Sequence, residues 1–220
     1  MPERSSAVRS VGGETIDGLL STAERLFAAE GVANVALTQI VASSGQKNRS
    51  ALHYHFGSRG GVLGAVMDRR LGPINARRLA LLEALPANAD LRDILAANIA
   101  ALGLTVVEEP WGPDYISILA QVRFHPSLLD HSLLRDDGLS GVRLARQRLR
   151  AAAPQVAAAR LARRFAWLTD AVVFELARWA RDTAPAQRTP AAMAALIEEL
   201  AAFGTAGLLA APPSAGAPTP

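Results

Sequence analysis

The side chains best suited to contact another molecule gather in one short polar segment, residues 46–55. Leu52 and Phe56 lie four positions apart, so on a helix they share one face and can anchor it inward. The other faces carry side chains that donate or accept hydrogen bonds. These are Gln46, Lys47, Asn48, Arg49, Ser50, His53 and Tyr54. Such a helix has the chemistry needed to read base edges in the major groove of DNA.

The local charge also favours an anionic partner for this segment. The whole chain has 23 Lys and Arg against 20 Asp and Glu, a net charge of +3 that indicates nothing about partners. Between Gly45 and Arg70, however, Asp68 is the only acidic residue, and the net charge of that stretch is +4. The cations are Lys47, Arg49, Arg59, Arg69 and Arg70. Phosphate contacts by such side chains supply most of the affinity of non-specific DNA binding.

The elements that must position this segment are helices. Alanine, leucine and arginine dominate, and no alternating apolar and polar run is long enough for a strand, so an all-α fold is predicted. The apolar spacing predicts helices over residues 14–30, 37–44 and 46–56, with Gly45 in the tight turn between the second and third. Three short helices joined in this way are typical of a helix-turn-helix, in which one helix supports the next in the groove.

The remainder of the chain is predicted to be a larger helical bundle. Ser58 can cap a fourth helix that runs to residue 85, with a kink or break at Pro73 because proline removes a helical hydrogen bond. Further helices are expected over residues 91–108, 111–125, 127–153 with a break near Gly138, 154–183 and 189–209. We divide the chain into a disordered arm (1–13), a helix-turn-helix domain (14–57), a connecting helix (58–85), a helical domain (86–210) and a disordered tail (211–220).

Residues 19–59 resemble the TetR family of bacterial transcriptional regulators. The matching anchors are Leu19, Leu20, Ala23, Leu26, Phe27, Gly31, Ile40, Gly45, the run from Leu52 through His53, Tyr54 and His55 to Phe56, and then Ser58 and Arg59. The resemblance implies an N-terminal helix-turn-helix domain that binds double-stranded operator DNA. It also implies a larger C-terminal helical bundle that binds a small-molecule effector and forms a homodimer.

The resemblance also extends the set of predicted DNA contacts. Thr38 falls where relatives often contact DNA, and Arg59 stands where the family usually carries a lysine that opens the fourth helix. The predicted DNA-binding residues are Thr38, Gln46, Lys47, Asn48, Arg49, Ser50, His53, Tyr54 and Arg59. Two alternatives stay open, because Asn48 is equally suited to cap the third helix and Tyr54 to pack against its neighbours.

Aromatic residues of the C-terminal part are predicted to line a ligand cavity. The family resemblance implies such a cavity between the middle helices, and aromatic walls with a few polar tips suit a small-molecule pocket. The candidates are Trp111, Tyr115, Phe124, His125, Trp167 and Phe174. Each of them alternatively belongs to the plain apolar core of the bundle.

The last two predicted helices carry more apolar surface than one chain can bury. In residues 154–183 one apolar stripe includes Phe165 and Leu168, and Trp167 and Phe174 belong to a second, so one of the two partners lies outside the subunit. Pairing with the same helices of a second chain would form a four-helix bundle, as in the dimer that the resemblance implies. The predicted dimer residues are Phe165, Leu168, Val172, Leu176, Leu196, Leu200 and Phe203.

Catalysis is not expected of this chain. It has no cysteine and 4 scattered histidines, and it shows neither paired carboxylates on one helix nor a glycine-rich phosphate loop. His53 and His55 lie on different faces of a helix, so neither a metal site nor a cofactor is predicted. Residues 1–13 lack the apolar core of a secretion signal, and the apolar stretch 200–211 is too short to cross a bilayer. A cytoplasmic protein without membrane contact is expected.

The sequence thus predicts a ligand-responsive, homodimeric DNA-binding regulator, a repressor that a small molecule releases from its operator. In the alternative hypothesis, the helix-turn-helix still binds DNA, and the C-terminal domain only dimerises or docks a protein partner. A connected internal cavity of several hundred Å3 would favour the ligand sensor, and a filled core would favour docking.

Overall fold

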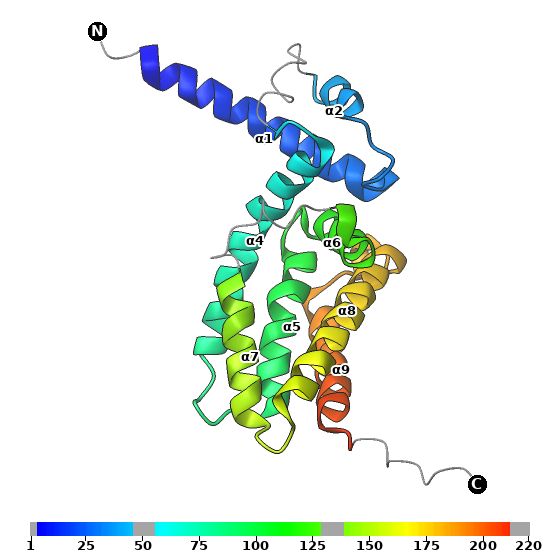
Figure 1. Ribbon diagram of the computed structural model, residues 1–220. Coiled ribbons are helices and arrows are strands. Elements are labelled where there is room, and N and C mark those ends of the chain that lie inside the picture. Colours follow the sequence, from blue (N-terminus) through cyan, green and yellow to red (C-terminus); the bar gives the residue numbers. More distant parts are fainter. Residues whose placement is uncertain (1–3, 46–55, 129–138, 212–220) are drawn as a thin grey trace, which may run out of the picture.

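The chain folds into a small helical head on a larger helical body (Figure 1). The computed structural model describes residues 4–45, 56–128 and 139–211, and the side chains from residue 16 onward. The head contains α1 (Arg4–Glu30), α2 (Leu37–Ser43) and the start of α4 (Arg59–Glu83). The body contains the rest of α4, α5 (Leu91–Glu108), α6 (Gly112–Phe124), α7 (Ser140–Ala152), α8 (Ala158–Asp182) and α9 (Pro190–Leu209). The all-α prediction is confirmed, because the described residues contain no strand.

Local start and stop signals in the sequence place several helix ends correctly. Ser58 caps α4 by accepting a hydrogen bond from the Gly61 amide at 3.1 Å. Thr189 caps α9 in the same way through the Ala192 amide at 3.2 Å. The helix predicted over residues 91–108 is α5 as observed. These ends follow from side chains only three positions away, which is why the sequence alone reveals them.

The N-terminal arm differs from the prediction, and α4 shows no break at its proline. α1 begins at Arg4, so the arm predicted to be disordered is helical from that residue onward. A helix that is already nucleated gains one backbone hydrogen bond for each residue added, even where the sequence carries no packing signal. α4 also continues through Pro73 without interruption. Ile74 and Leu82 are buried on the far side of the proline, and their packing holds the helix together.

The second half of the chain is divided differently from the prediction. Of the helix expected over residues 127–153 with a break near Gly138, the part after the break is α7, and the first residues form the 3-10 turn η1 (Pro126–Leu128). Residues 129–138 and the predicted tail from residue 212 lie outside the described residues. α8 begins at Ala158 rather than at 154, and the 3-10 turn η4 (Pro185–Gln187) connects α8 to α9.

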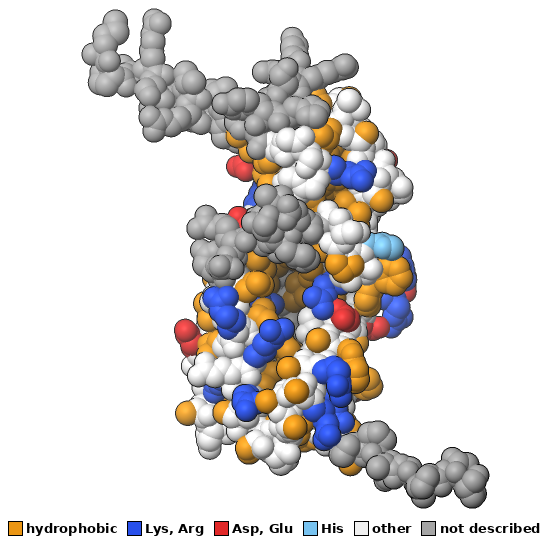
Figure 2. Space-filling model, in the orientation of Figure 1, with side chains coloured by type: hydrophobic (Ala, Val, Ile, Leu, Met, Phe, Trp, Pro, Cys, Tyr) orange, Lys and Arg blue, Asp and Glu red, His pale blue; other side chains and the backbone are white. Residues whose placement is uncertain are grey.

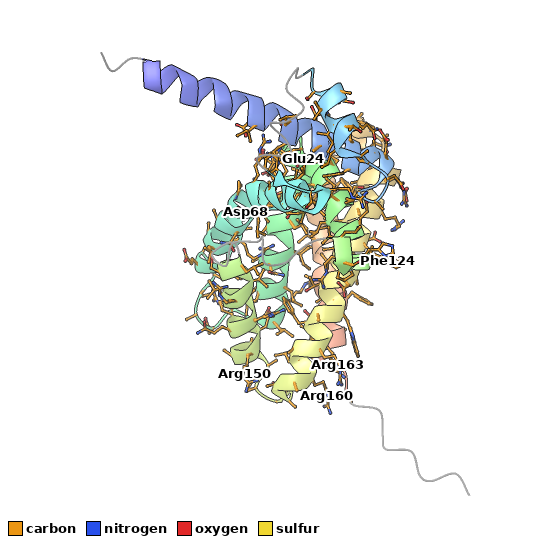
Figure 3. All side chains as sticks on the ribbon, turned by 45° about the horizontal axis from the view of Figure 1, so that its top comes forward. Glu24, Asp68, Phe124, Arg150, Arg160 and Arg163 are labelled. Atoms are coloured by element: carbon orange, nitrogen blue, oxygen red, sulfur yellow. The ribbon has the colours of Figure 1, made fainter. Side chains whose placement is uncertain are left out.

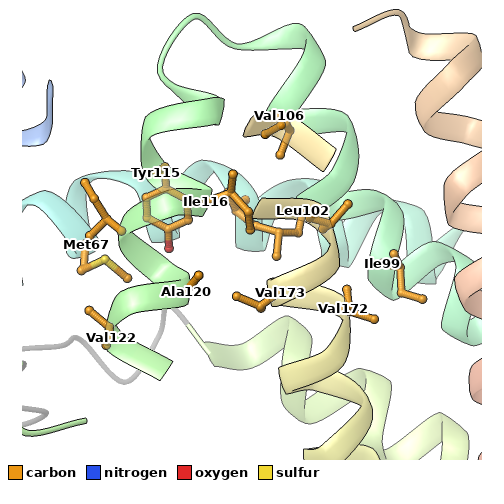
Figure 4. Close-up of a cluster of buried hydrophobic side chains, with 14 of the residues drawn as sticks. Met67, Ile99, Leu102, Val106, Tyr115, Ile116, Ala120, Val122, Val172 and Val173 are labelled. Atoms are coloured by element: carbon orange, nitrogen blue, oxygen red, sulfur yellow. The ribbon is translucent and has the colours of Figure 1, made fainter. Parts of the chain in front are cut away.

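The core of the body forms around α5, which packs against α4, α6, α7 and most extensively α9. Figure 4 shows one part of this core, where Tyr115 of α6 lies beside Met67 of α4 and Ile116 lies beside Leu102 of α5. The Tyr115 side chain is fully enclosed, and burial raises the pKa of its hydroxyl far above the ordinary value. A large aromatic residue at this position packs α6 against α4.

Arg148 of α7 holds the end of α4. Its guanidinium donates hydrogen bonds to the backbone carbonyls of Leu82, Leu85 and Pro86. The last carbonyls of a helix have no partner within the helix, so a charged donor at this place stabilises the end of α4.

α9 also exposes much of its apolar surface. By length and composition alone it is apolar enough to cross a membrane, with a mean hydropathy of 1.5, so the predicted apolar stretch 200–211 belongs to a longer apolar helix. Its inner face, which includes Met193, Ile197 and Ala201, is buried against the body. The outer face of α9 remains uncovered within one chain.

Gly18 within α1 and Gly31 just after it test the assigned end of this helix. Gly31 ends α1 with φ +90°, whereas Gly18 lies within the helix, where an added Cβ meets nothing within 4 Å. Gly31→Ala should destabilise the chain by about 1–2 kcal/mol because L residues are strained at that φ. Gly18→Ala should stabilise the chain by about 0.5–1 kcal/mol, because alanine has less conformational freedom than glycine in the unfolded state. Urea unfolding of the two variants measures both changes. Equal effects of the two substitutions would contradict the assigned helix end.

Candidate functional site

The head presents α2 as an exposed element on α1. Ile40 and Val41 of α2 are buried, whereas Thr38 near its start is exposed. Gly45 follows α2 with φ +70°, which supplies the tight turn predicted for a helix-turn-helix. The predicted DNA-contacting residues of the next segment lie outside the described residues. These are Gln46, Lys47, Asn48, Arg49, Ser50, His53 and Tyr54.

Arg59, the other predicted DNA contact, also supports the head. Its guanidinium donates a hydrogen bond of 2.6 Å to the backbone carbonyl of Ala33, in the turn between α1 and α2. The side chain is otherwise exposed. It therefore ties the start of α4 to the α1–α2 turn while remaining accessible to a phosphate group.

Arg69 and Arg70 hold α4 against α1. The sequence counts both among the cations that residues 45–70 offer to an anionic partner, and the structure corrects this. Arg70 donates to both carboxylate oxygens of Glu24, at 2.9 Å from Nε and 2.6 Å from Nη2. Arg69 donates to the Ser21 hydroxyl at 3.1 Å and to the Asp17 carbonyl at 3.3 Å. The charge of Arg70 is thus neutralised inside the protein. The net charge of +4 overstates what the segment offers to DNA.

The Glu24–Arg70 pair lies where the head meets the body. Glu24 is 3% exposed, and its position on α1 is marked in Figure 3. The guanidinium carbon of Arg70 lies 4.3 Å from the centre of the Trp111 ring, and Trp111 packs edge-on against Tyr115. Residues from α1, α4 and α6 therefore share one buried contact. Burial, together with the nearby Glu24 charge, raises the pKa of Asp114 in the first turn of α6.

Gln121 of α6 makes a second link between body and head. Its Oε1 accepts a hydrogen bond from the Val32 amide at 2.8 Å, and its Nε2 donates to the Phe27 carbonyl at 3.1 Å. One side chain of the body thus satisfies two backbone groups where α1 ends. Any shift of α6 must either move this end of α1 with it or break both hydrogen bonds.

The predicted ligand-lining aromatics occupy different environments, and most of them do not line a cavity. Tyr115 is in the core and Trp111 is half-buried at the joint with α1. Phe124, Trp167 and Phe174 are 69%, 61% and 40% exposed, and His125 is exposed too, so the prediction is wrong for these four. Phe124 projects from the end of α6 in Figure 3, and Figure 2 shows hydrophobic side chains around the pale-blue histidine. The Phe124 and Phe174 rings pack edge-to-face, 6.2 Å apart, at the surface.

The two apolar stripes of α8 are exchanged relative to the prediction. Phe165, Leu168, Val172 and Leu176, expected at a dimer interface, are all buried within the chain. The second stripe, which contains Trp167 and Phe174, faces outward instead. This inner stripe packs toward α5, α6 and α9, and Leu168 lies close to Gly204 of α9. On α9, Leu196 and Leu200 are half-buried and Phe203 is 67% exposed.

An internal cavity of about 60 Å3 lies between α4, α5, α7 and α8. Arg78 of α4 and Asn98 of α5 contribute its main polar groups. Sequence reasoning missed both residues. The signal for Arg78 was present, because it falls four positions after Ile74 and four before Leu82, on the buried stripe of its helix.

A head of this kind on a helical body defines a DNA-binding transcriptional regulator. A family model described as bacterial regulatory proteins of the tetR family matches residues 19–66, and the tetracyclin repressor-like C-terminal domain matches residues 99–207. The chain therefore belongs to the TetR family of transcriptional regulators. No curated protein matches it at a significant level.

Solved structures of the family share the fold. The fatty acid degradation regulator FadR from Bacillus halodurans has a TM-score of 0.63 at 13% identity, over 89% of this chain and 95% of that one. PfmR from Thermus thermophilus has a TM-score of 0.52 at 18% identity, over 89% and 96% of the two chains. A regulator from Streptomyces coelicolor gives the same score and identity, over 89% and 80%. At these identities the likeness shows the fold alone.

The Gln121 link can be tested by removing its hydrogen bonds. Gln121→Leu keeps the approximate size of the side chain but leaves the Val32 amide and the Phe27 carbonyl without partners, at a cost of about 1–3 kcal/mol. Hydrogen exchange at the Val32 amide should become faster, more than at amides of α5. The control is Gln39→Leu, which removes an exposed hydrogen bond to Glu30 and should change stability by less than about 0.5 kcal/mol. Unchanged exchange at Val32 in the Gln121 variant would show that the link does not hold the head.

Proposed function

We propose that this regulator is a homodimeric repressor that a small molecule releases from its operator in the cytoplasm. The observation that carries the proposal is the course of α4. This single helix contributes Arg59 to the head, Arg70 to the joint with α1 and Arg78 to the internal cavity. At 1.5 Å per residue, it connects the head and the cavity over about 28 Å without a break.

Reading of DNA is assigned to the segment after Gly45 together with α2. Lys47 and Arg49 supply positive charge there, and the exposed Thr38 and Arg59 flank the segment in the described structure. Phosphate contacts give the salt-dependent part of the affinity, and contacts to base edges give about 1–3 kcal/mol of discrimination each. Two heads in a dimer would contact two half-sites one helical turn apart.

Regulation would follow from the shared contacts of α1, α4 and α6. A molecule in the body that moves α4 or α6 also moves α1, because Glu24–Arg70 and Gln121 tie these helices together. A change in head spacing would then lower the affinity for the operator. Couplings of about 1–3 kcal/mol are ordinary for such a mechanism.

Dimerisation is assigned to the outer faces of α8 and α9. Leu196, Leu200, Phe203 and Gly207 of α9 follow one another at helical spacing, and all are exposed or half-buried in a single chain. α8 packs beside α9 and exposes Trp167. A second copy of the same two helices would cover this surface as a four-helix bundle.

The alternative function, a body that docks a protein partner, is favoured by the size of the cavity. At about 60 Å3 it is far smaller than typical ligand pockets of roughly 300–1,000 Å3. A larger open groove of about 490 Å3 lies at the other end of the body, between the loop before α5 and the ends of α7 and α9. A partner protein seated there would lie far from the head.

DNA binding is tested on a duplex selected from a random pool by the wild-type protein. The double variant Lys47→Ala/Arg49→Ala should lose about 100-fold or more in affinity and show a weaker dependence on salt, because two cationic contacts are removed. The control Arg150→Ala/Arg160→Ala removes the same charge at the end of the body away from the head (Figure 3) and should bind normally. Gel-shift titrations measure the affinity of each variant for the duplex. Equal affinities of the two double variants would refute the assigned DNA-binding surface.

The dimer surface is tested with two exposed apolar side chains on different parts of the body. Phe203→Glu places a charge in the α9 stripe and should convert the dimer to a monomer, whereas Leu139→Glu, at the start of α7, lies outside the proposed interface and should leave the dimer intact. A charge buried at a dimer interface without a partner costs several kcal/mol, and it costs little at a free surface. Sedimentation velocity reads the oligomeric state. A dimeric Phe203→Glu variant would contradict the proposed interface.

A further inference from the structure

A small pocket of the body is lined by a buried cation that has no ion-pair partner among the described residues. Arg78 is 7% exposed, and among the described residues it makes neither a hydrogen bond nor an ion pair, with its Nε fully enclosed. Burial lowers the pKa of the Arg78 guanidinium, but arginine remains charged at neutral pH. An isolated buried charge is among the most destabilising features that a protein core can contain.

Other arginines of the body show how unusual this is. Arg77, the preceding residue, pairs with Glu108 at 2.7 Å and donates to the Thr105 hydroxyl. Arg148 donates to the carbonyls that end α4, and Arg164 donates to the carbonyls of Leu208 and Ala210. Each of these cations is satisfied by its own surroundings. Of these four, only Arg78 has no hydrogen bond or ion pair among the described residues, and it lines the pocket.

The rest of the cavity fits an anion with an apolar body. Asn98 of α5 is its second unsatisfied group, because the buried Oδ1 has no partner among the described residues. Rotation of this amide would turn its NH2 toward an anion. No carboxylate lines the cavity within the described residues, and most of its wall is apolar. The apolar lining includes Leu95, Ile99, Leu102, Phe165, Leu168 and Val172.

We propose that the effector is a small carboxylate with an apolar tail, whose carboxylate pairs with Arg78 while its tail lies among the aliphatic side chains of α5 and α8. This inference rests on the proposed function and names the chemical class of its effector. A planar guanidinium can donate two parallel hydrogen bonds to a carboxylate, and this geometry is strongest away from water. The space of about 60 Å3 equals the liquid volume of about two water molecules, so as it stands it accepts the carboxylate group. The tail would have to displace side chains of α5 and α8.

The position of Arg78 on α4 connects the effector with the head. The same helix carries Arg70 at the joint with α1, two helical turns earlier. An anion that draws the Arg78 side chain toward α5 and α8 therefore acts on the helix that holds the head.

The test compares carboxylates with their neutral amides in the full-length protein. The probes are acetate, butyrate, hexanoate and octanoate, each beside the amide of equal length, and thermal unfolding and isothermal titration measure their binding. At one hundred times its Kd, the carboxylate that fits best should raise the Tm of the wild type by about 5–10 °C, and its amide should have little effect. Arg77→Gln is the matched control, and this variant should respond to the carboxylate as the wild type does.

Variants at Arg78 decide whether this side chain is responsible. Arg78→Met should raise the Tm of the free protein, because it removes an unpaired buried charge, and should abolish the response to carboxylates. Arg78→Lys keeps the charge without the planar fork and should weaken binding at least tenfold. The proposal is overturned if no carboxylate of the series stabilises the wild type, or if Arg78→Met responds as the wild type does.

Release of DNA is measured separately, so that the two proposals can fail independently. A carboxylate that binds through Arg78 but leaves the protein on its selected duplex would support the anion site and contradict the proposed regulation. A neutral compound that releases the duplex, with no carboxylate binding, would overturn the anion site and support the regulation.

Discussion

The buried contact among α1, α4 and α6 is the interaction on which the rest of the structure depends. Glu24 and Arg70 are both removed from water there, and the Trp111 ring covers the guanidinium. Loss of one partner from a buried pair costs about 3–5 kcal/mol, so separation of the head from the body is strongly opposed. The head therefore has one preferred orientation on the body. In the proposed dimer, this contact would let the body set the position of each DNA-reading head.

The same constraint explains why α4 contains arginines at such different depths. Arg59 is exposed, Arg70 is buried with Glu24, and Arg78 is buried without a hydrogen bond or ion pair among the described residues. Packing alone would favour an aliphatic side chain at the last position, as Ile74 and Leu82 on either side show. A residue that lowers stability and lies on the helix leading to the head is best explained by a requirement for binding.

What the sequence could predict was the local part of the structure. Gly45 marks the end of α2 through its own backbone, Ser58 marks the start of α4 through a bond to a nearby amide, and the sequence indicates both. The Glu24–Arg70 pair joins residues 46 positions apart, and Gln121 reaches Val32 across 89, so neither could be inferred from spacing.

The faces of α8 show the same limit. Both of its stripes are apolar, and only the shape of the space beside α5 and α6 decides which one is buried. The prediction that these aromatic residues line a cavity was wrong for a related reason. An aromatic residue in a sequence gives no sign of whether it will line a pocket or lie on the surface. Of the predicted DNA contacts, only Thr38 and Arg59 lie in the described residues.

The most direct measurement of the central claim is the distance between the two heads of the proposed dimer. The chain has no cysteine, so Ala29→Cys provides a single exposed spin-label site on α1 of each subunit, outside the predicted DNA contacts. Double electron–electron resonance should give a narrow distance distribution on the selected duplex, near the spacing of about 34 Å between successive major grooves, and a shifted one when an effector binds. Absence of dipolar coupling, or a distribution that the duplex does not change, would contradict the account.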